Sequence, residues 1–359
     1  AEGKPVLLFV RTPWSRASLW AEEKIYTDPQ VIALVNDRWI PVKVDRDRRP
    51  DIDQRYQIAV GAVSKGEAGW PLTALLFDTG EVMSGRSHIP LEDRMGNPGL
   101  RSLLARMADY YQVNKAKAAN MRELVMVQFD RERAQVRPAR LAAALIDEMF
   151  SGMTAALDRE SGGFGPAPRV PTPYVPELAA VLHRSRGDDV FLDLLNRTLS
   201  GMEAGAIHDR VGGGFHRSTL DPVWRLPEFE KLLSFNAPLL MDYLLGYQAT
   251  GNLVFKRTAE GIVDYLLGTL SAPGGGFYIA QWAAAGAEEP KGLYLSWSEE
   301  EFKRVVPAEL HKIAATLFDV RPDGDVTLGP PARNLLYLAM TRKEASERLG
   351  ITIEALADF

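Results

Sequence analysis

The stretch PWSRAS, residues 13–18, decides how the first third of the chain is interpreted. It follows an apolar run, VLLFV at 6–10, and overlaps a segment with helical propensity, ASLWAEEKIY at 17–26. A short apolar run bounded by prolines predicts a buried strand. The sequence therefore predicts a strand, then a loop that carries Ser15 and Ser18, then a helix.

Alternating strand and helix patterns continue to about residue 112. Asp28, followed by proline, predicts the N-cap of a second helix. WIPVKV at 39–44 predicts a second strand, and LTALLF at 72–77 predicts the first strand of a hairpin. The order β-α-β-α-β-β, closed by a helix over 100–111, predicts a small mixed sheet flanked by helices.

From about residue 138 the pattern becomes helical throughout. The expected helical windows are 138–157, 174–186, 188–205, 232–250 and 253–271. A Gly-rich phrase recurs between them, with phenylalanine at 164, 215 and 277. This period fits repeated helical hairpins, which stack because one hairpin cannot bury its own apolar face. The charged stretch 113–137 is interpreted as a helical connector.

Composition excludes several classes of function. The chain has 359 residues, which favours two domains, and a formal net charge of −5, which gives no electrostatic footprint for nucleic acid. No apolar run approaches the roughly 18 residues that a membrane span needs. The chain has no cysteine, so thiolate chemistry and Cys-ligated metals are excluded, whereas exported and cytosolic locations both stay open. No motif implies a cofactor, and His208 and His216 lack a third metal ligand.

Several phrases together resemble the YyaL-like (spermatogenesis-associated protein 20) family. They are VKVDRDRRPDID (42–53), GWPLTALLFDTGE (69–81), GGFGPAPRVPTP (162–173), IHDRVGGGFHR (207–217), FEKLL with Asn236-Ala237 (229–237) and GGGFY (274–278). The resemblance implies an α/β thioredoxin-like domain over 1–112, followed over 138–359 by an all-α, six-hairpin glycosidase-like (α/α) barrel. About five barrel helices are visible and a closed barrel needs about twelve, so the barrel is partial, and we expect either that the sequence is part of a longer chain or that a partner covers the open side.

The sequence departs from the family pattern at its reactive positions. Ser15 and Ser18 stand where the family usually has two cysteines, and Glu228 stands where it has histidine. Phe235 replaces an aspartate, and QWAA at 281–284 replaces an acidic run. Because a hydroxyl cannot carry out dithiol–disulfide exchange, the chain is not a thiol-disulfide oxidoreductase. We expect Ser15 or Ser18 to cap the following helix instead.

Three functions remain open. The first is a pseudoenzyme that binds or scaffolds, as an accessory subunit with a protein partner. The second is a carbohydrate-active enzyme, epimerase or glycosidase-like, in which Asp209, His216 and Glu228 supply acid–base chemistry. In this hypothesis Trp224 is the stacking platform for the sugar, and Arg217 is a further binding candidate.

The third function is peptide binding without chemistry at the edge of a cis proline. Trp70-Pro71 stands where a thioredoxin-like fold holds its cis proline. This hypothesis predicts an open groove lined by Trp14, Trp70 and Pro71.

Overall fold

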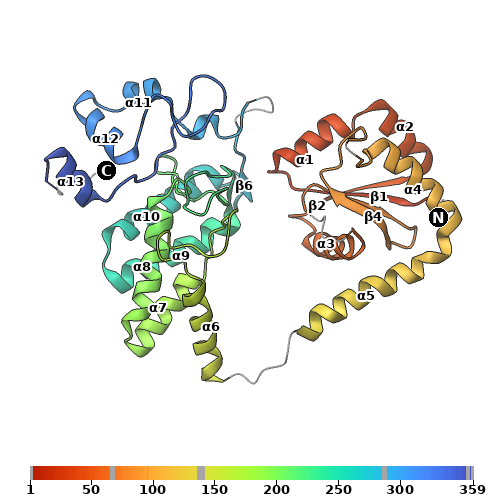
Figure 1. Cartoon of the computed structure of the whole chain (residues 1–359), viewed down its shortest axis with the longest axis horizontal. Helices are drawn as coiled ribbons and strands as arrows, with labels where there is room; N and C mark the ends of the chain where they lie inside the picture. Colours follow the sequence, from red (N-terminus) through yellow and green to blue (C-terminus); the bar gives the residue numbers. More distant parts are fainter. Residues whose placement is uncertain are drawn as a thin grey trace. The chain divides into compact units, whose positions relative to one another are not determined.

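The computed structural model describes residues 3–64, 69–94, 96–135, 142–284, 289–352 and Leu356. The chain divides into two compact units, residues 1–140 and 141–359, which are described separately (Figure 1). The start of the expected window 138–157, the end of the connector and part of the C-terminal end lie outside the described residues.

The first unit is built on a four-stranded sheet. Its strands are β1 (Val6–Arg11), β2 (Ile40–Asp45), β3 (Leu72–Leu76) and β4 (Val82–Ser87), in the order β2-β1-β3-β4. β1 is parallel to β2 and antiparallel to β3, and Val10 pairs with both Val44 and Leu72. The two central strands are the apolar runs of the sequence, because both of their faces are covered.

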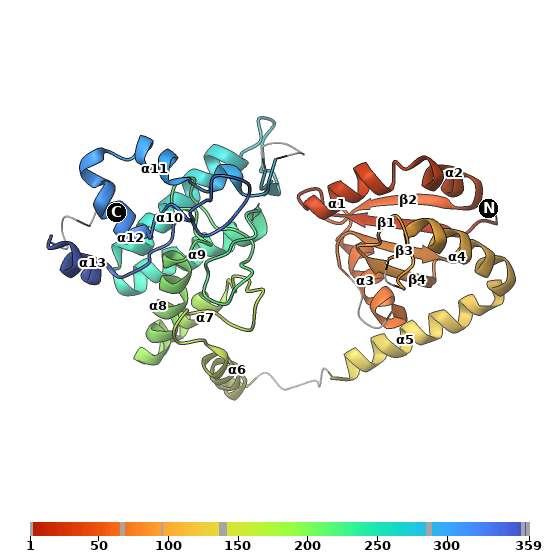
Figure 2. The ribbon, with the colours of Figure 1, turned by 45° about the horizontal axis from the view of Figure 1, so that its top comes forward.

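Helices cover both faces of this sheet (Figure 2). They are α1 (Arg16–Trp20), continued by the π-helical turn Ala21–Ile25, α2 (Pro29–Arg38), α3 (Pro50–Ser64), α4 (Leu100–Asn114), the 3-10 turn Lys115–Lys117 and α5 (Ala118–Gln135). Leu7 and Phe9 pack into a core with α2 and α4, whereas Leu8 and Val10 pack against α3. Asp28 caps α2 as predicted, since its carboxylate accepts the N–H groups at 30 and 31. This architecture is the expected thioredoxin-like fold.

The stretch expected to be a connector is helical, and its main helix packs on the first unit. α5 contacts α3 and β4. Met121 and Val125 pack against the two cores of the unit, and Arg122 forms an ion pair with Glu81. The helix therefore belongs to the first unit because of these contacts.

The second unit is all-α apart from one two-residue strand pair. Its helices are α6 (Ala143–Ala156), α7 (Val175–Arg186), α8 (Asp189–Ala204), α9 (Leu233–Thr250), α10 (Leu253–Tyr265), α11 (Glu299–Val305), α12 (His311–Phe318) and α13 (Arg342–Leu349). Short turns at Leu266–Leu270, Leu293–Leu295 and Ala308–Leu310, and the strands β5 (Lys231–Leu232) and β6 (Ala280–Gln281), complete it. The helical hairpins α7–α8 and α9–α10 turn at Gly187 and Gly251, and the region is of the expected partial (α/α)-barrel class.

The three Gly-rich phrases adopt the same local structure. Isolated bridges join Leu157 to Phe164, His208 to Phe215, and Ser271 to Phe277. Gly162 and Gly213 have φ of +73° and +70°, and a Cβ atom there would overlap the carbonyl oxygens of Arg197 and Gly261 in α8 and α10. Glycine is required at these two positions because the loop backbone packs directly on helix backbone.

Candidate functional site

The carbohydrate hypothesis depends on four residues around the second Gly-rich loop. Asp209 forms an ion pair with Lys231, whose Nζ lies 2.5 Å from Oδ2 and whose side chain is 1% exposed. Lys231 also donates to the carbonyl of Gly213, and Asp209 Oδ1 accepts the N–H groups of Val211 and Gly212. Burial raises the pKa of Asp209, but the Lys231 charge and these hydrogen bonds outweigh it and hold the pKa below its usual value. The Asp209 carboxylate is therefore ionised and paired with Lys231, and it holds the loop closed through its hydrogen bonds to the loop backbone.

His216 is enclosed next to this pair. Its Nδ1 donates to the carbonyl of Phe229 at 2.8 Å, and its ring packs edge-on against the Phe229 ring. Burial, together with the Lys231 charge, lowers the pKa of His216 to about 4. His216, His208 and Asp209 line a shared cavity of about 20 Å³, which holds about one water molecule and no sugar.

Glu228 belongs to a different cluster. Its Oε2 forms an ion pair with Arg217 at 2.8 Å and a second ion pair with Lys291. Arg217 and Lys291 also reach Glu230, at 3.0 and 2.8 Å, which closes a ring of two carboxylates and two cations. Burial raises the pKa of Glu228, but Lys291 and Arg217 outweigh it and lower the pKa. Glu228 is not poised to act as a general acid at neutral pH.

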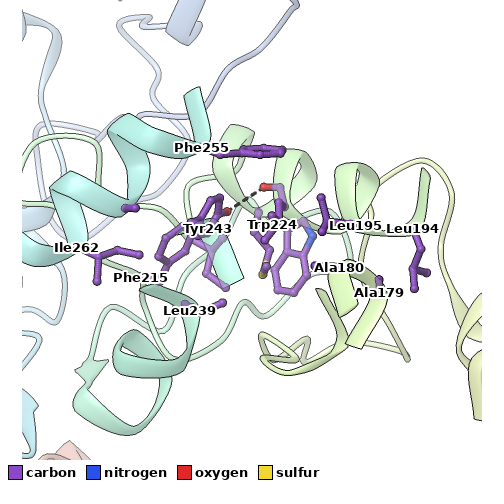
Figure 3. Close-up of a cluster of buried hydrophobic side chains, with 14 of the residues drawn as sticks. Ala179, Ala180, Leu194, Leu195, Phe215, Trp224, Leu239, Tyr243, Phe255 and Ile262 are labelled. Carbon is purple, nitrogen blue, oxygen red and sulfur yellow. Dashed lines mark hydrogen bonds between the residues drawn. The ribbon is translucent and has the colours of Figure 1, made fainter. Parts of the chain in front are cut away.

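Trp224 is a core residue, and the expectation that it offers a stacking platform is wrong. It is 2% exposed and lies inside the main apolar cluster of the second unit, with Leu195 and Ala180 beside it (Figure 3). Its indole Nε1 donates to the carbonyl of Ser161 at 2.9 Å. Of the four residues, the structure brings together only Asp209 and His216, and it leaves no room for a sugar between them.

A larger cavity of about 510 Å³ borders the same second Gly-rich loop and is also lined by α10 and α12. Its polar lining includes Asp209, Arg257, Asp264 and the buried ion pair between Glu203 and Arg210, whose atoms lie 2.8 Å apart. Sequence reasoning missed this cavity because its walls come from helices far apart in the chain. In the part of the chain that the structure describes, no three His, Asp or Glu side chains form a group that could hold a metal ion.

The first unit contains a groove beside Pro71, whose peptide bond with Trp70 is cis as expected. The cavity measures about 420 Å³. It is lined by Arg16, Ala17, Trp20, Ala21, Ile25, Tyr26, Pro71, Thr73, His88, Ile89, Pro90 and Leu100. The lining is mostly apolar, and Trp20 is 52% exposed. An open groove at the cis proline is therefore present, with Trp20 as its exposed aromatic side chain.

Trp14 and Trp70 do not line this groove, which corrects the prediction for both residues. The Nε1 of Trp14 donates to Asp47 at 3.0 Å, and the Nε1 of Trp70 donates to Asp53 at 2.8 Å. Both indoles are thereby held by carboxylates that follow β2. The tryptophan that faces the groove lies in α1, and no sequence signal separated it from Trp14.

Arg46 connects the two tryptophan–carboxylate pairs. Its guanidinium lies 3.4 Å from Asp53, 3.9 Å from Asp47 and 4.4 Å from the centre of the Trp70 ring. Burial raises the pKa of Asp47, although Arg46 and Trp14 oppose this. The network ties the loop before α1 and the cis-proline loop to the same segment, so it fixes the two sides of the groove relative to each other.

The two serines do not take part in the groove. Ser15 occupies the N-cap position of α1, but its side chain makes no capping hydrogen bond, so the capping prediction is wrong. Ser18 is buried within the first turn, where its Oγ accepts the N–H of Thr12 at 3.2 Å. Ser18 therefore fixes the end of β1.

Comparisons with known proteins identify relatives of this chain. A family model described as "Protein of unknown function, DUF255" (Thioredox_DsbH) matches residues 1–130. Spermatogenesis-associated protein 20 of Rattus norvegicus is 29% identical over 99% of this chain, and that of Mus musculus is 32% identical over 85%. The chain belongs to the YyaL-like family, which includes spermatogenesis-associated protein 20. It spans about half of the length of these relatives, 48% of the rat protein and 40% of the mouse protein.

The family assignment agrees with the fold and gives no reaction. Among solved structures, a cellobiose 2-epimerase from Spirochaeta thermophila DSM 6192 aligns with 61% of this chain and 67% of its own, at 17% identity and a TM-score of 0.30. This member of the YyaL-like family is a thioredoxin-like protein without thiols, and no helix among its described residues is long and apolar enough to cross a membrane.

Proposed function

We propose that the chain is a non-redox binding protein whose first unit holds an extended peptide segment of a partner in the groove beside Pro71. The observation that carries the proposal is the cavity of about 420 Å³ at the cis proline, in a unit that has serine at both thiol positions. A thioredoxin-like unit without thiols keeps the means to bind a polypeptide and lacks the means to exchange its disulfides.

The lining of the groove indicates what the segment carries. Trp20, Ile25, Ile89 and Leu100 offer apolar surface, and the volume lies within the range of about 300–1,000 Å³ that is typical of ligand pockets. No backbone hydrogen bond joins Trp70 to another residue in the described part of the chain. The Trp70 side chain lies outside the groove, but its N–H and C=O stand next to Pro71, and they can pair with an extended backbone in the manner of strand addition. The occupant that fits is an extended segment with one large apolar side chain.

The test uses the full chain and labelled 12-residue peptides that carry one central phenylalanine among glycine and serine. Fluorescence anisotropy gives the affinity. Ala17→Trp fills the groove and Trp20→Ala removes its exposed wall, so each variant is expected to weaken binding at least tenfold at an unchanged thermal midpoint. Leu124→Ala, at a 47% exposed position on α5, is the matched control and is expected to bind normally. Absence of binding, or equal binding by Ala17→Trp, would overturn the proposal.

The proposal includes assembly with a protein partner. Apolar side chains of α9 also reach the surface: Met241 and Leu244 are 47% and 40% exposed, and Leu267 after α10 is 61% exposed. Helices of this kind are normally covered. The cover that fits is a further helical hairpin, because α7 and α8 already pack on α9 in this way. Native mass spectrometry of the protein from its source tests this. A lone 39.7 kDa monomer that binds no apolar dye would contradict it.

A carbohydrate ligand is the alternative, and it now depends on the cavity of about 510 Å³ in the second unit. The polar lining at Arg257, Thr258 and Asp264 favours a hydroxylated ligand over an apolar one. Titration with cellobiose and glucose, followed by saturation-transfer NMR, tests this alternative. Loss of the signal in Thr258→Val is expected, and no transfer at millimolar sugar would remove the hypothesis.

A further inference from the structure

The ionisable side chains that line the groove of the first unit carry no negative charge at neutral pH. They are Arg16, Tyr26 and His88, and no aspartate or glutamate is among the lining residues. Tyr26 is partly buried, its hydroxyl lies 2.7 Å from that of Thr73, and desolvation raises its pKa, so it stays neutral. The fixed charge that a ligand meets at this apolar groove is therefore the positive charge of Arg16.

Arg16 differs from the arginines around it. Arg11 is neutralised by Glu22 and Asp45, at 3.2 and 3.8 Å, and Arg46 is neutralised by Asp53. Arg16 is exposed, and within the described part of the chain no hydrogen bond or ion pair occupies its guanidinium. A guanidinium that has no partner in its own chain can bind a carboxylate of a ligand through two parallel hydrogen bonds.

We infer that the segment bound beside Pro71 carries an acidic residue next to its large apolar residue, and that Arg16 selects it. This inference rests on the proposed function, since it names the class of peptide for the same groove. The apolar residue supplies most of the affinity because it removes apolar surface from water. The carboxylate supplies selectivity. An exposed ion pair between arginine and a carboxylate adds little affinity, but it favours acidic ligands over basic ones.

Three peptides that differ only beside the central phenylalanine test the inference, with Asp, Asn or Lys at both flanking positions. The full chain is expected to bind the Asp peptide about two- to fivefold more tightly than the Asn peptide at low salt, which is the range of an exposed ion pair. The preference is expected to fall as salt rises through 0.5 M, since exposed pairs are screened.

Two variants assign the preference to one side chain. Arg16→Gln is expected to bind the Asp and Asn peptides equally, and Arg16→Glu is expected to favour the Lys peptide. Arg55→Glu is the matched control, because it reverses an exposed charge on α3, and it is expected to keep the preference for Asp.

The outcomes separate the two proposals. If the wild-type chain binds all three peptides equally, or if Arg16→Glu keeps the preference for Asp, charge selection by Arg16 is overturned while peptide binding stands. If no peptide binds the wild-type chain, the proposed function fails and this inference fails with it. Octanoate, an apolar carboxylate that is not a peptide, is tested beside the peptides. If it binds the wild-type chain and no peptide does, the proposed function and this inference are both overturned.

Discussion

Lys231 Nζ lies 2.5 Å from Oδ2 of Asp209, and the same arrangement occurs one repeat earlier, where Arg169 Nη1 lies 3.1 Å from Oδ2 of Asp158. In both repeats the aspartate also accepts backbone N–H groups of its Gly-rich loop. The cation comes from a later segment and closes that loop onto the rest of the unit. Residues that seemed suited to sugar chemistry therefore form a repeated structural link.

Replacement of Lys231 by methionine is expected to destabilise the protein strongly. The substitution leaves Asp209 buried without its cation, which typically costs about 3–5 kcal/mol. Urea denaturation followed by circular dichroism measures the loss. Lys256→Met removes an exposed i,i+4 pair with Glu260 and is expected to cost under about 1 kcal/mol. If the two variants are equally stable, the buried ion pair contributes no more to stability than the exposed one.

Replacement of Gly213 by alanine is expected to cost more than the same change at Gly275. Both glycines have positive φ, +70° and +91°, which costs an alanine about 1–2 kcal/mol. At Gly213 the added Cβ would also overlap the carbonyl oxygen of Gly261, whereas at Gly275 no atom lies within 4 Å. Thermal midpoints of the two variants give the comparison, and a smaller loss at Gly213 would contradict the packing described for this loop.

Replacement of Asp242 by asparagine is expected to remove part of the pH dependence of stability. Asp242 is fully buried in α9, and neither carboxylate oxygen has a hydrogen-bond partner among the described residues. Burial raises the pKa of Asp242 to about 7, which the nearby backbone of Tyr174 and Glu177 offsets only in part. The folded state thus keeps a proton that the unfolded state releases near pH 4, so this group lowers stability as pH rises from about 4 to 7.

Urea midpoints from pH 4 to 8 check this expectation. Asp242→Asn is expected to match the wild type near pH 4 and to exceed it above pH 7. His208 and His216, whose pKa values burial lowers to about 4, act with the opposite sign between about pH 4 and 6.5. Both histidines are present in the two proteins, so the difference between the profiles isolates Asp242. Parallel profiles would contradict the assignment.

Replacement of Asp53 by alanine is expected to loosen the cis-proline loop. The change leaves the Trp70 indole N–H without its acceptor and Arg46 without its nearest carboxylate, and one unsatisfied buried group costs about 1–3 kcal/mol. Faster amide hydrogen exchange at residues 69–73 and weaker peptide binding are the expected readouts. Asp51→Ala is the control, because Asp51 pairs with Arg49 at the surface and its side chain is 64% exposed. If amide exchange in Asp53→Ala is unchanged, the network does not hold the cis-proline loop in place.

Elements with long apolar patterns could be predicted from the sequence. The windows 188–205 and 232–250 agree with α8 and α9 within a residue or two, because each is a long apolar-rich run that ends at a glycine, Gly205 or Gly251. The Asp28 cap was also predictable, since capping depends on residues next to each other in the chain.

The candidate sites depend on partners far apart in the sequence. Nothing near Asp209 indicated that Lys231 would neutralise it, and nothing near Glu228 indicated Lys291, which is 63 residues away. Which tryptophan faces the groove likewise depends on where an indole N–H finds a carboxylate, and Trp14 finds Asp47 across 33 residues. Residue type and spacing therefore indicated which residues belong to the candidate sites. They did not indicate the ion pairs and hydrogen bonds that decide the chemistry of those residues.

The third Gly-rich loop differs from the first two in what anchors it. Ala272 stands where they have aspartate, and Phe277 is 47% exposed whereas Phe215 is fully buried. Repeat proteins open unit by unit according to the strength of each interface. The repeats of this barrel region should thus differ in local cooperativity, with amide protons around 272–278 exchanging through small openings and those around 209–216 exchanging only when the whole unit unfolds.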